Sequence, residues 1–340
     1  MGVSLDENLI CETICFPFGE EPVEYCLDYK YLGICTNDFL GFDFSAGILA
    51  NSAGKALGAT IRKMIKNGGF PLNVFKNLYE SSVCSISDYG GEIWGYKEYE
   101  ETRKVHLRAI RAFLGIPKRA PIPGVLAEMN WLDPRSRTQI RMVRHFKRLM
   151  KLPDHRLTKK VFLWDRLLND FVFNSPYFSI KETVVDLQKS LLEKDQTKWE
   201  ADCMKKPKLR TFILFKEFKN ETSYLFKPLS FIQRKFLVKL RQGVLTLQIE
   251  TGRFQRPRLP AEVRLCVICN NGEVEDEAHF LLRCAAYRRQ RLILLGKLAD
   301  TEAFLHLSDK EKLSVLLNGE FVKSTAQFII NSFDQRSLLL

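Results

Sequence analysis

The spacing of apolar positions divides the chain of 340 residues into a short strand-like stretch and a long helical remainder. Residues 10–36 hold brief apolar and aromatic runs, which are interrupted by Pro17, by the sequence GEEP at 19–22 and by Gly33. Such runs predict two or three strands paired in hairpins. From Ser45 onward the apolar positions recur every three or four residues, which is the period of a helix with one buried face.

Three helices joined by short loops are predicted in the part that follows. The first is expected to end at the glycine pair 68–69 and to bury a face that consists of Ile48, Leu49, Ala53, Ala56, Leu57, Thr60, Ile61 and Met64. The second, about 72–85, follows Pro71, and the third, about 97–114, ends at Gly115. This arrangement predicts a helical bundle.

A fourth helix, predicted from about Pro134 to Leu152, combines an apolar face with a cationic one. The apolar side holds Ile140, Val143, Phe146 and Met150. The opposite side holds Arg137, Arg141, Arg144, Arg148 and Lys151, which recur at intervals of four and three residues. A cationic face of this kind favours a polyanion such as nucleic acid, although a solvated surface without a partner is the alternative interpretation.

The charge of the whole chain supports the same two interpretations. The net charge is +12, and residues 1–50 hold nine acidic side chains and one basic, so the positive charge belongs to the rest of the chain. Residues 101–160 hold 16 Lys and Arg against 4 Asp and Glu, and residues 201–260 hold 14 against 4. In the second stretch aromatic residues lie between the cations. Phe212, Phe215 and Phe218 are predicted either to stack on bases or, as the spacing of three favours, to form a core stripe.

The sequence also restricts the compartment. No run of 18 apolar residues occurs, so we expect no membrane span. The N-terminus lacks the positive region of a secretory signal, and an odd total of nine cysteines argues against a disulfide framework. We therefore expect a protein of the cytoplasm or nucleus that is not secreted, with reduced thiols.

Three of these thiols and a histidine lie within the sequence CVICNNGEVEDEAHFLLRC at 266–284. Cys266, Cys269, His279 and Cys284 follow the spacing C-x2-C-x9-H-x4-C, which is typical of a small structural zinc site. The residues Asn270-Asn271-Gly272 suit the tight turn that such a site needs. The alternative is an ordinary core of buried thiols and a histidine. The other four histidines stand alone, so nucleophilic catalysis has no support.

The spacing of the last two ligands raises a geometric question. Five positions on a straight α-helix correspond to a rotation of about 140°, so the helix at His279 must start late, bend or be distorted. The acidic run Glu273, Glu275, Asp276 and Glu277 is expected to favour the start of this helix through its dipole. Beyond it, Arg288 and Arg289, together with Arg283 and Arg291, predict a second nucleic-acid face.

Several stretches, taken together and in order, resemble a known family. They are DYKYLGI at 28–34, then KALGATIRKMI, LYESSVCSISDYGGEIWG, LRAIRAFLGIPKRAP, LAEMNWLDPRSR, LRTFILFKEF and ETSYL, and finally VLTLQIETGRFQRPRLPAEVRLCVICNNGEVEDEAHFLLRCAAYRRQR. They are similar to the C-terminal half of reverse transcriptases of LINE-type (non-LTR) retrotransposons. The resemblance covers most of residues 10–295.

This resemblance implies a mainly α protein with a small β-hairpin region at the N-terminus. Its expected segments are a palm remnant at 1–44 with a primer-grip-like hairpin at Tyr31, Leu32 and Gly33, a helical thumb-like domain at 45–170, a basic helical connecting region at 171–260, and a zinc knuckle with C-terminal helices at 261–340. The family polymerises DNA with paired aspartates that hold two magnesium ions. The chain contains no Asp-Asp dipeptide. We also expect no counterpart of the endonuclease of the family in it.

Three hypotheses of function follow from these features. The first is a truncated, retrotransposon-derived protein that binds RNA or an RNA–DNA hybrid without catalysis. The second is the non-catalytic part of an active RNA-directed DNA polymerase, completed by a palm-containing chain or a longer gene product. The third is a zinc-stapled helical module for protein interaction, with its charge solvated.

We predict that the purified chain alone does not extend a primer, because it lacks the carboxylate pair that two-metal chemistry requires. The measurement is nucleotide incorporation on RNA and DNA templates with magnesium or manganese. The prediction would be contradicted by nucleotide incorporation that is lost when residues of this chain are substituted, since such a loss would exclude a contaminating polymerase.

Overall fold

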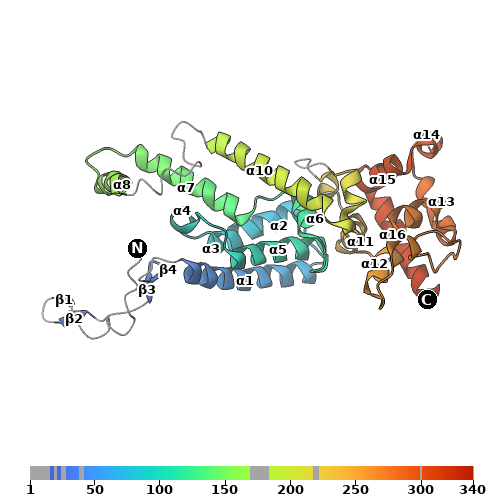
Figure 1. Cartoon of the computed structure of the whole chain (residues 1–340), viewed down its shortest axis with the longest axis horizontal. Coiled ribbons are helices and arrows are strands. Elements are labelled where there is room, and N and C mark those ends of the chain that lie inside the picture. Colours follow the sequence, from blue (N-terminus) through green and yellow to red (C-terminus); the bar gives the residue numbers. More distant parts are fainter. Residues whose placement is uncertain are drawn as a thin grey trace.

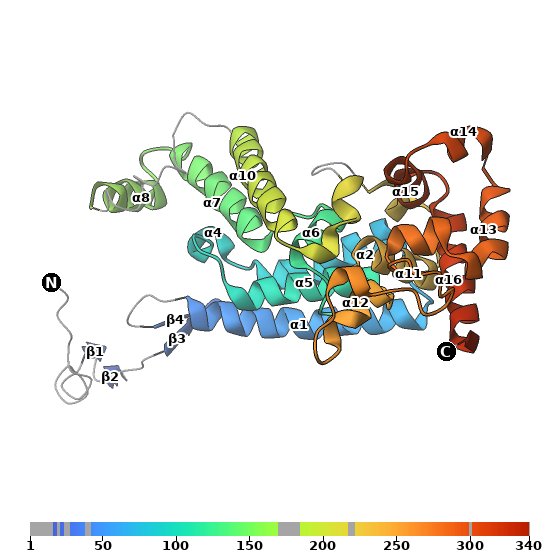
Figure 2. The same ribbon diagram turned by 45° about the vertical axis from the view of Figure 1, so that its right-hand side comes forward.

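The chain was analysed as a computed structural model, which describes residues 16–18, 21–23, 28–37, 42–168, 184–216, 222–298 and 301–339. Over these ranges it is mainly helical, and its named strands lie only near the N-terminus, which confirms the predicted fold class. Figures 1 and 2 show an elongated molecule with the strands at one end and the C-terminal helices at the other. None of the described helices has the length and apolar character needed to cross a membrane.

The strands form two separate antiparallel hairpins. β1 (Phe16–Phe18) pairs with β2 (Glu21–Val23), and β3 (Asp28–Tyr31) pairs with β4 (Ile34–Asn37). The second hairpin turns through Leu32 and Gly33, whose φ angles are 47° and 89°. A two-residue turn with positive φ at both positions matches the right-handed twist of paired strands, and Gly33 adopts this conformation without strain.

The predicted bundle is present in the middle of the molecule (Figure 1). Its helices are α1 (Asp43–Lys66), α2 (Leu72–Tyr79), a five-residue π-helix (Glu80–Cys84), α3 (Ser85–Ser87), α4 (Gly91–Trp94) and α5 (Glu100–Leu114). Most of the face predicted for the first helix is buried, but the side chain of Ile48 is 38% exposed. The segment predicted as one helix at 72–85 consists of α2, the π-helix and α3, which follow one another without a break.

The remaining helices extend the bundle at its two ends (Figure 2). They are α6 (Ile122–Met129), α7 (Pro134–Met150), α8 (Leu157–Leu168), α10 (Val184–Met204), α11 (Phe231–Arg241), α12 (Gln248–Thr251), α13 (Arg288–Leu295), α14 (Thr301–His306), α15 (Asp309–Asn318) and α16 (Val322–Leu339). Short 3-10 turns connect them at 207–209, 212–214, 223–226, 252–254, 261–263 and 285–287, and a second π-helix spans His279–Arg283.

One hydrophobic core joins most of these helices. It runs from Ala53 in α1 through Phe113 in α5 and Leu237 in α11 to Phe280 and Ile329. The core therefore includes residues of the thumb-like, connecting and knuckle segments expected from the sequence. The boundaries between those segments stay predictions, and the apolar packing crosses them.

A buried ion pair lies in the middle of this core. The side chains of Glu128 in α6 and Arg241 in α11 are both fully buried, and their Oε1 and Nε atoms are 2.6 Å apart. Arg241 also donates to the carbonyl of Leu317 in α15, and Gln242 donates to the Gly124 carbonyl. Thr222 Oγ1 donates to the Glu128 carbonyl at 2.6 Å. The pair therefore joins helices from three distant parts of the sequence.

Aromatic rings enclose the guanidinium of Arg241. Its central carbon lies 4.6 Å from the ring centroid of Phe215, 4.7 Å from that of Tyr224 and 5.8 Å from that of Phe212. Phe212 is fully buried, so it is a core residue and does not form a stacking platform. Phe218 lies outside the described residues.

Glu128→Gln is expected to lower the free energy of unfolding by about 3–5 kcal/mol, because it leaves the buried charge of Arg241 without its partner. Replacing both residues, Glu128→Leu with Arg241→Met, is expected to cost much less, since no charge then remains buried. Urea unfolding followed by circular dichroism measures both effects. The control is Glu101→Gln, which removes an exposed partner of Lys104 and is expected to change stability by less than about 1 kcal/mol. A Glu128→Gln variant as stable as this control would contradict the prediction.

Candidate metal centre and cationic surface

The four predicted ligands converge in space. The ligand atoms of Cys266, Cys269, His279 and Cys284 all lie within 4.8 Å of one another. Cys266 Sγ is 3.9 Å from Cys284 Sγ, and Cys269 Sγ is 3.4 Å from His279 Nε2. The four residues are therefore close enough to bind one metal ion.

A short hairpin positions the first two ligands. Leu265 and Val274 form an antiparallel bridge, and the backbone N–H of Cys266 donates to the carbonyl of Glu273 at 2.8 Å. The turn between them needs positive φ at Asn270 (52°) and Gly272 (78°), residue types that adopt this conformation most readily. The turn predicted from the sequence is confirmed.

A π-helix positions the other two ligands and answers the geometric question of their spacing. Residues His279–Arg283 form the π-helix, and the N–H of Cys284 donates to the carbonyl of His279 at 2.7 Å. An i→i+5 hydrogen bond of this kind widens the helical turn, so that side chains five positions apart share one side. The side chain of Arg291 donates to the carbonyls of Leu281 and Cys284, at 2.9 and 2.7 Å, and so fixes the end of the widened turn.

A carboxylate fixes the orientation of the His279 ring from the side opposite the thiols. Its Nδ1 lies 2.8 Å from Oε2 of Glu273, while its Nε2 lies on the side of the thiols. A carboxylate on the far nitrogen of a metal-binding histidine selects the tautomer and orients the ring. This contact lowers the pKa of the Glu273 carboxyl, which therefore stays ionised. Glu273 also accepts from Nε of Arg283 at 3.2 Å.

Burial favours the protonated thiols of Cys266 and Cys284 when no metal is bound. It raises the pKa of Cys284 to about 12, with the neighbouring thiols Cys266 and Cys269 adding to the rise, and it raises the pKa of Cys266 as well. A metal ion binds the thiolate form, so binding at neutral pH would release protons. Its affinity should therefore fall as the pH is lowered.

The other acidic residues of the run have contacts that the prediction did not include. Asp276 acts at the helix start, where its Oδ1 accepts from the N–H of His279 at 2.7 Å. Glu275 is fully buried and pairs with Arg336 in α16, and Glu277 is buried and pairs with Arg210 at 2.6 Å. Glu277 is the first residue of the helix, so a dipole role stays a prediction for it, while Glu275 lies before the helix. Both glutamates pair with distant residues. They connect the metal centre to distant parts of the chain.

The basic residues beyond the metal centre divide into two kinds. Arg283 contacts Glu273 and Asp309, and Arg291 binds backbone carbonyls, so both have internal roles. Arg288 and Arg289, at the start of α13, are exposed. Arg283 is exposed as well but pairs with acidic side chains, so Arg288 and Arg289 are the members of the second predicted nucleic-acid face that combine exposure with no such pairing among the described residues.

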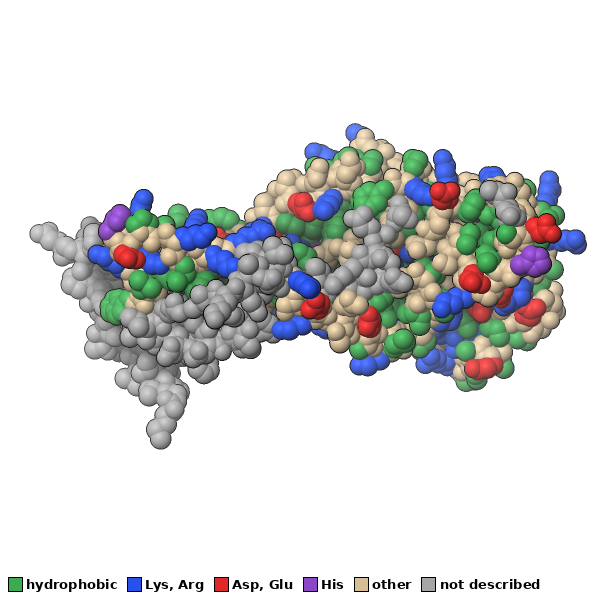
Figure 3. Space-filling model, turned by 90° about the horizontal axis from the view of Figure 1, so that it is seen from above, with side chains coloured by type: hydrophobic (Ala, Val, Ile, Leu, Met, Phe, Trp, Pro, Cys, Tyr) green, Lys and Arg blue, Asp and Glu red, His purple; other side chains and the backbone are tan. Residues whose placement is uncertain are grey.

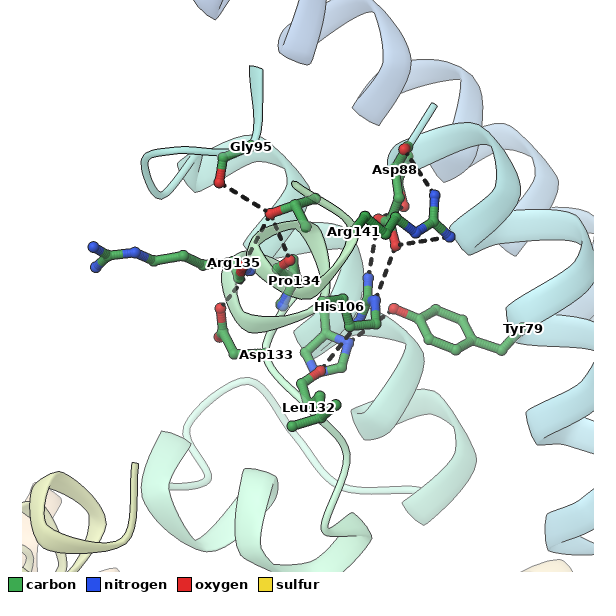
Figure 4. Close-up of polar contacts among 12 residues, drawn as sticks. Tyr79, Asp88, Gly95, His106, Leu132, Asp133, Pro134, Arg135 and Arg141 are labelled. Carbon is green, nitrogen blue, oxygen red and sulfur yellow. Dashed lines mark hydrogen bonds and ion pairs between the residues drawn. The ribbon is translucent and has the colours of Figure 1, made fainter. Parts of the chain in front are cut away.

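The cationic helix α7 is anchored at its N-terminal half. Asp133 caps it by accepting from the N–H of Arg135, and Arg137 forms two hydrogen bonds, of 3.0 and 3.1 Å, to the carboxylate of Asp88. Arg141 donates to the backbone carbonyl of Asp88 at 2.9 Å. Figure 4 shows this network, from which Arg135 points away. The Asp88 side chain is 1% exposed, so Arg137 has a structural role.

The C-terminal half of α7 is exposed. Arg144, Arg148 and Lys151 are all open to solvent, in contrast to Arg137 and Arg141. Between residues 134 and 168 the chain holds eleven Lys and Arg against two Asp. Figure 3 shows such side chains gathered on the end of the molecule where α7 and α8 lie. The five predicted residues therefore lie on one helix but differ in availability.

The primer-grip-like hairpin lies beside the anchor of α7. Tyr31 and Leu32 at its tip are 63% and 73% exposed, and the hydroxyl of Tyr89 donates to the Leu32 carbonyl at 2.8 Å. Tyr89 directly follows Asp88, which holds α7. One loop therefore fixes both the hairpin and the cationic helix.

Sequence reasoning missed the residues that hold the functional side chains in place. Asp88 and Tyr89 lie in a glycine-rich loop, DYGG, and nothing local marks them as partners of residues 49 or more positions away. Glu273 was considered only for the helix dipole. Its place six positions before His279, across a turn, is the signal that could have identified it as the support of that ring.

No protein-family model, curated protein or solved structure matches this chain.

Glu273→Gln is expected to weaken metal binding about 10- to 100-fold, because it removes the carboxylate that orients His279. Competition with a chromogenic chelator measures the affinity. The matched control is Glu262→Gln on the nearby turn Ala261–Val263, which lies in the same region but does not contact a ligand.

The same assay separates the ligands from ordinary buried thiols. Cys269→Ser is expected to lose most of the bound metal, whereas Cys203→Ser, at a buried cysteine of α10, is expected to retain it. Equal metal content in the two variants would show that the four residues are ordinary core.

Proposed function

We propose that this chain binds single-stranded RNA or an RNA–DNA hybrid without catalysis, as the C-terminal portion of a LINE-type reverse transcriptase. The observation that carries the proposal is the loop Asp88-Tyr89. It places the exposed hairpin tip, Tyr31 and Leu32, near a helix that ends in exposed cations. Both features are the ones expected to contact a primer–template strand.

The chemistry of the exposed half of α7 suits a phosphate backbone. Arg144, Arg148 and Lys151 present three cations at intervals of four and three residues, so they follow one side of a helix. Phosphate contacts position a protein on a strand without reading its sequence. Binding is therefore expected to depend on salt and to tolerate different sequences.

We propose that the metal is zinc and that its role is structural. Tetrahedral zinc, with bonds of about 2.3 Å to sulfur and about 2.0–2.1 Å to nitrogen, places two sulfurs about 3.8 Å apart and a sulfur and a nitrogen about 3.6 Å apart. The separations of 3.9 and 3.4 Å in this centre are close to those values. Three thiols and one imidazole complete a tetrahedron, which leaves no position for a catalytic water.

A palm-containing polymerase chain is the partner that this proposal implies for activity. The chain has no paired aspartates, so any polymerisation would use carboxylates that another polypeptide or a longer product supplies. The role of this chain would then be to hold the strand near that site.

Replacing Arg144, Arg148 and Lys151 together by Gln is expected to reduce the log–log salt slope of single-strand binding by about 2, at about 0.7 per neutralised phosphate. Fluorescence anisotropy of a labelled oligonucleotide between about 50 and 200 mM salt, an interval over which several phosphate contacts change the affinity by orders of magnitude, measures the slope.

The matched control removes the same number of cations elsewhere. Lys310, Lys312 and Lys323 lie on α15 and α16, at the other end of the molecule, and their replacement by Gln lowers the net charge equally. Equal salt slopes for the two triple variants would indicate that the α7 cations form a solvated surface that does not contact the strand.

A further inference from the structure

A second candidate site lies between α12 and α16, at the opposite end of the molecule from the cationic part of α7 (Figure 1). It is a pocket of about 590 Å³, within the range of about 300–1,000 Å³ that is usual for small-ligand sites. It is lined by Thr246, Gln248, Thr251, Phe254, Gln255, Phe333, Arg336 and Ser337. Amide and hydroxyl groups therefore alternate with two aromatic rings around it.

The inner wall of this pocket is rigidly held. Arg336 is committed to the buried Glu275 and contacts the hydroxyl of Tyr287 at 3.4 Å. The ring of Phe333 lies 5.7 Å from the rings of both Phe236 and Phe280, measured between centroids. Phe280 follows the metal ligand His279 directly, so the wall is continuous with the metal centre.

The rim of the pocket carries an exposed ring, and two free cations follow that ring along the chain. Phe254 is 63% exposed and lines the pocket. Arg256 and Arg258 follow it and are also exposed. Neither arginine forms a hydrogen bond or an ion pair with any residue that the structure describes. The exposed ring and the two arginines that follow it therefore offer an aromatic face and positive charge to the same ligand.

The loop that carries this rim is clamped to the body of the protein. The guanidinium of Arg264 donates to the carbonyl of Leu259, at 3.1 and 2.6 Å, and to that of Ile249 at 2.6 Å. Gly252 lies under it, where a Cβ would be 2.8 Å from Arg264 Cγ. Phe254 therefore projects from a loop whose two ends are fixed.

The surroundings hold a surplus of positive charge. Glu250 is already paired with Lys208 at 2.5 Å and with Arg253 at 3.1 Å. Burial lowers the pKa of Arg253, and the nearby Arg210, Arg264 and Arg258 lower it further. Cations that destabilise one another in this way would be stabilised by an anionic ligand.

We infer that this pocket receives an unpaired base of a single-stranded nucleic acid, with Phe254 stacking on the base and Arg256 and Arg258 contacting the adjacent phosphates. The inference rests on the proposed function, since the strand is the ligand in both. The side-chain amide of Gln255 is available to the edge of the base. Gln248 Oε1 accepts from Thr251 Oγ1 and the Ser337 hydroxyl donates to the Asp334 carbonyl, so these two residues offer the Gln248 amide N–H groups and the Ser337 oxygen as an acceptor. An aromatic ring beside cations is the usual way in which proteins bind single strands without strong sequence preference.

The test compares Phe254→Ala with Phe254→Tyr in the full-length, metal-loaded protein. Binding of a labelled oligodeoxythymidine is expected to weaken about 5- to 100-fold in the Ala variant, which loses the stacking face, and to be retained in the Tyr variant, which keeps it. An oligonucleotide of abasic sites is expected to bind both variants equally. Circular dichroism and metal content establish that the exposed substitution leaves the fold intact.

The phosphate contacts have a separate readout. Replacing Arg256 and Arg258 by Gln is expected to reduce the salt slope by about 1.4, at about 0.7 per contact. An Ala variant at Phe254 that binds oligodeoxythymidine as tightly as the unaltered protein, or that loses abasic binding equally, would overturn the inference.

The two proposals can fail independently. If the unaltered protein binds and the α7 triple variant loses affinity while the Phe254 variants do not differ, the pocket is not a base site and the proposed function stands. If the unaltered protein does not bind these oligonucleotides, single-stranded RNA or an RNA–DNA hybrid at low salt, the proposed function and the pocket inference are both wrong.

Discussion

The ion pair of Glu128 and Arg241 is the interaction on which the arrangement of the helices depends. An isolated charge in a core costs several kcal/mol, so each of these side chains requires the other. Because Arg241 also binds the Leu317 carbonyl and Thr222 binds the Glu128 carbonyl, the requirement extends to four segments of the chain. Apolar packing alone tolerates small slips between helices, whereas these directional contacts define one arrangement.

Contacts between acidic side chains and distant partners also surround the candidate metal centre. Glu273, Glu275 and Glu277 alternate along a short extended stretch, and each has a different partner. Glu273 supports His279, Glu275 binds Arg336 of the last helix, and Glu277 binds Arg210 of the connecting region. The metal centre is thereby continuous with the core. It is also continuous with the wall of the pocket beside α16, because Phe280 packs on Phe333 and Glu275 pairs with Arg336.

The arginines of this chain fall into two groups, one that binds groups within the protein and one that is exposed. Buried or half-buried guanidinium groups, as in Arg137, Arg264 and Arg336, bind carboxylates and carbonyls and hold segments together. Exposed ones, as in Arg144 and Arg256, remain for a partner. A planar guanidinium with five N–H donors suits both tasks, since it can satisfy several acceptors at once or grip a phosphate. The total of 52 Lys and Arg therefore overstates the number of cations that the proposed nucleic-acid partner could contact.

The sequence by itself determined the local features of this protein. Helical periodicity located α1, α5 and α7, the glycine at 115 located a helix end, and C-x2-C with the following turn located the metal ligands. Each of these signals acts over a few residues, through backbone conformation or through the period of a buried face. The sequence also showed that the spacing of His279 and Cys284 does not fit a straight helix.

Only the tertiary structure decided which residues of each local pattern are buried and paired and which are exposed. Periodicity places Arg137 and Arg144 on one face, but Asp88, 49 positions before Arg137, neutralises the first and leaves the second exposed. The glutamates at 275 and 277 pair with residues 61 and 67 positions away, which no local pattern contains. The widened turn after His279 likewise required the packing of Phe280 and the contacts of Arg291. Burial and pairing depend on which segments meet in space, and that is a property of the folded chain as a whole.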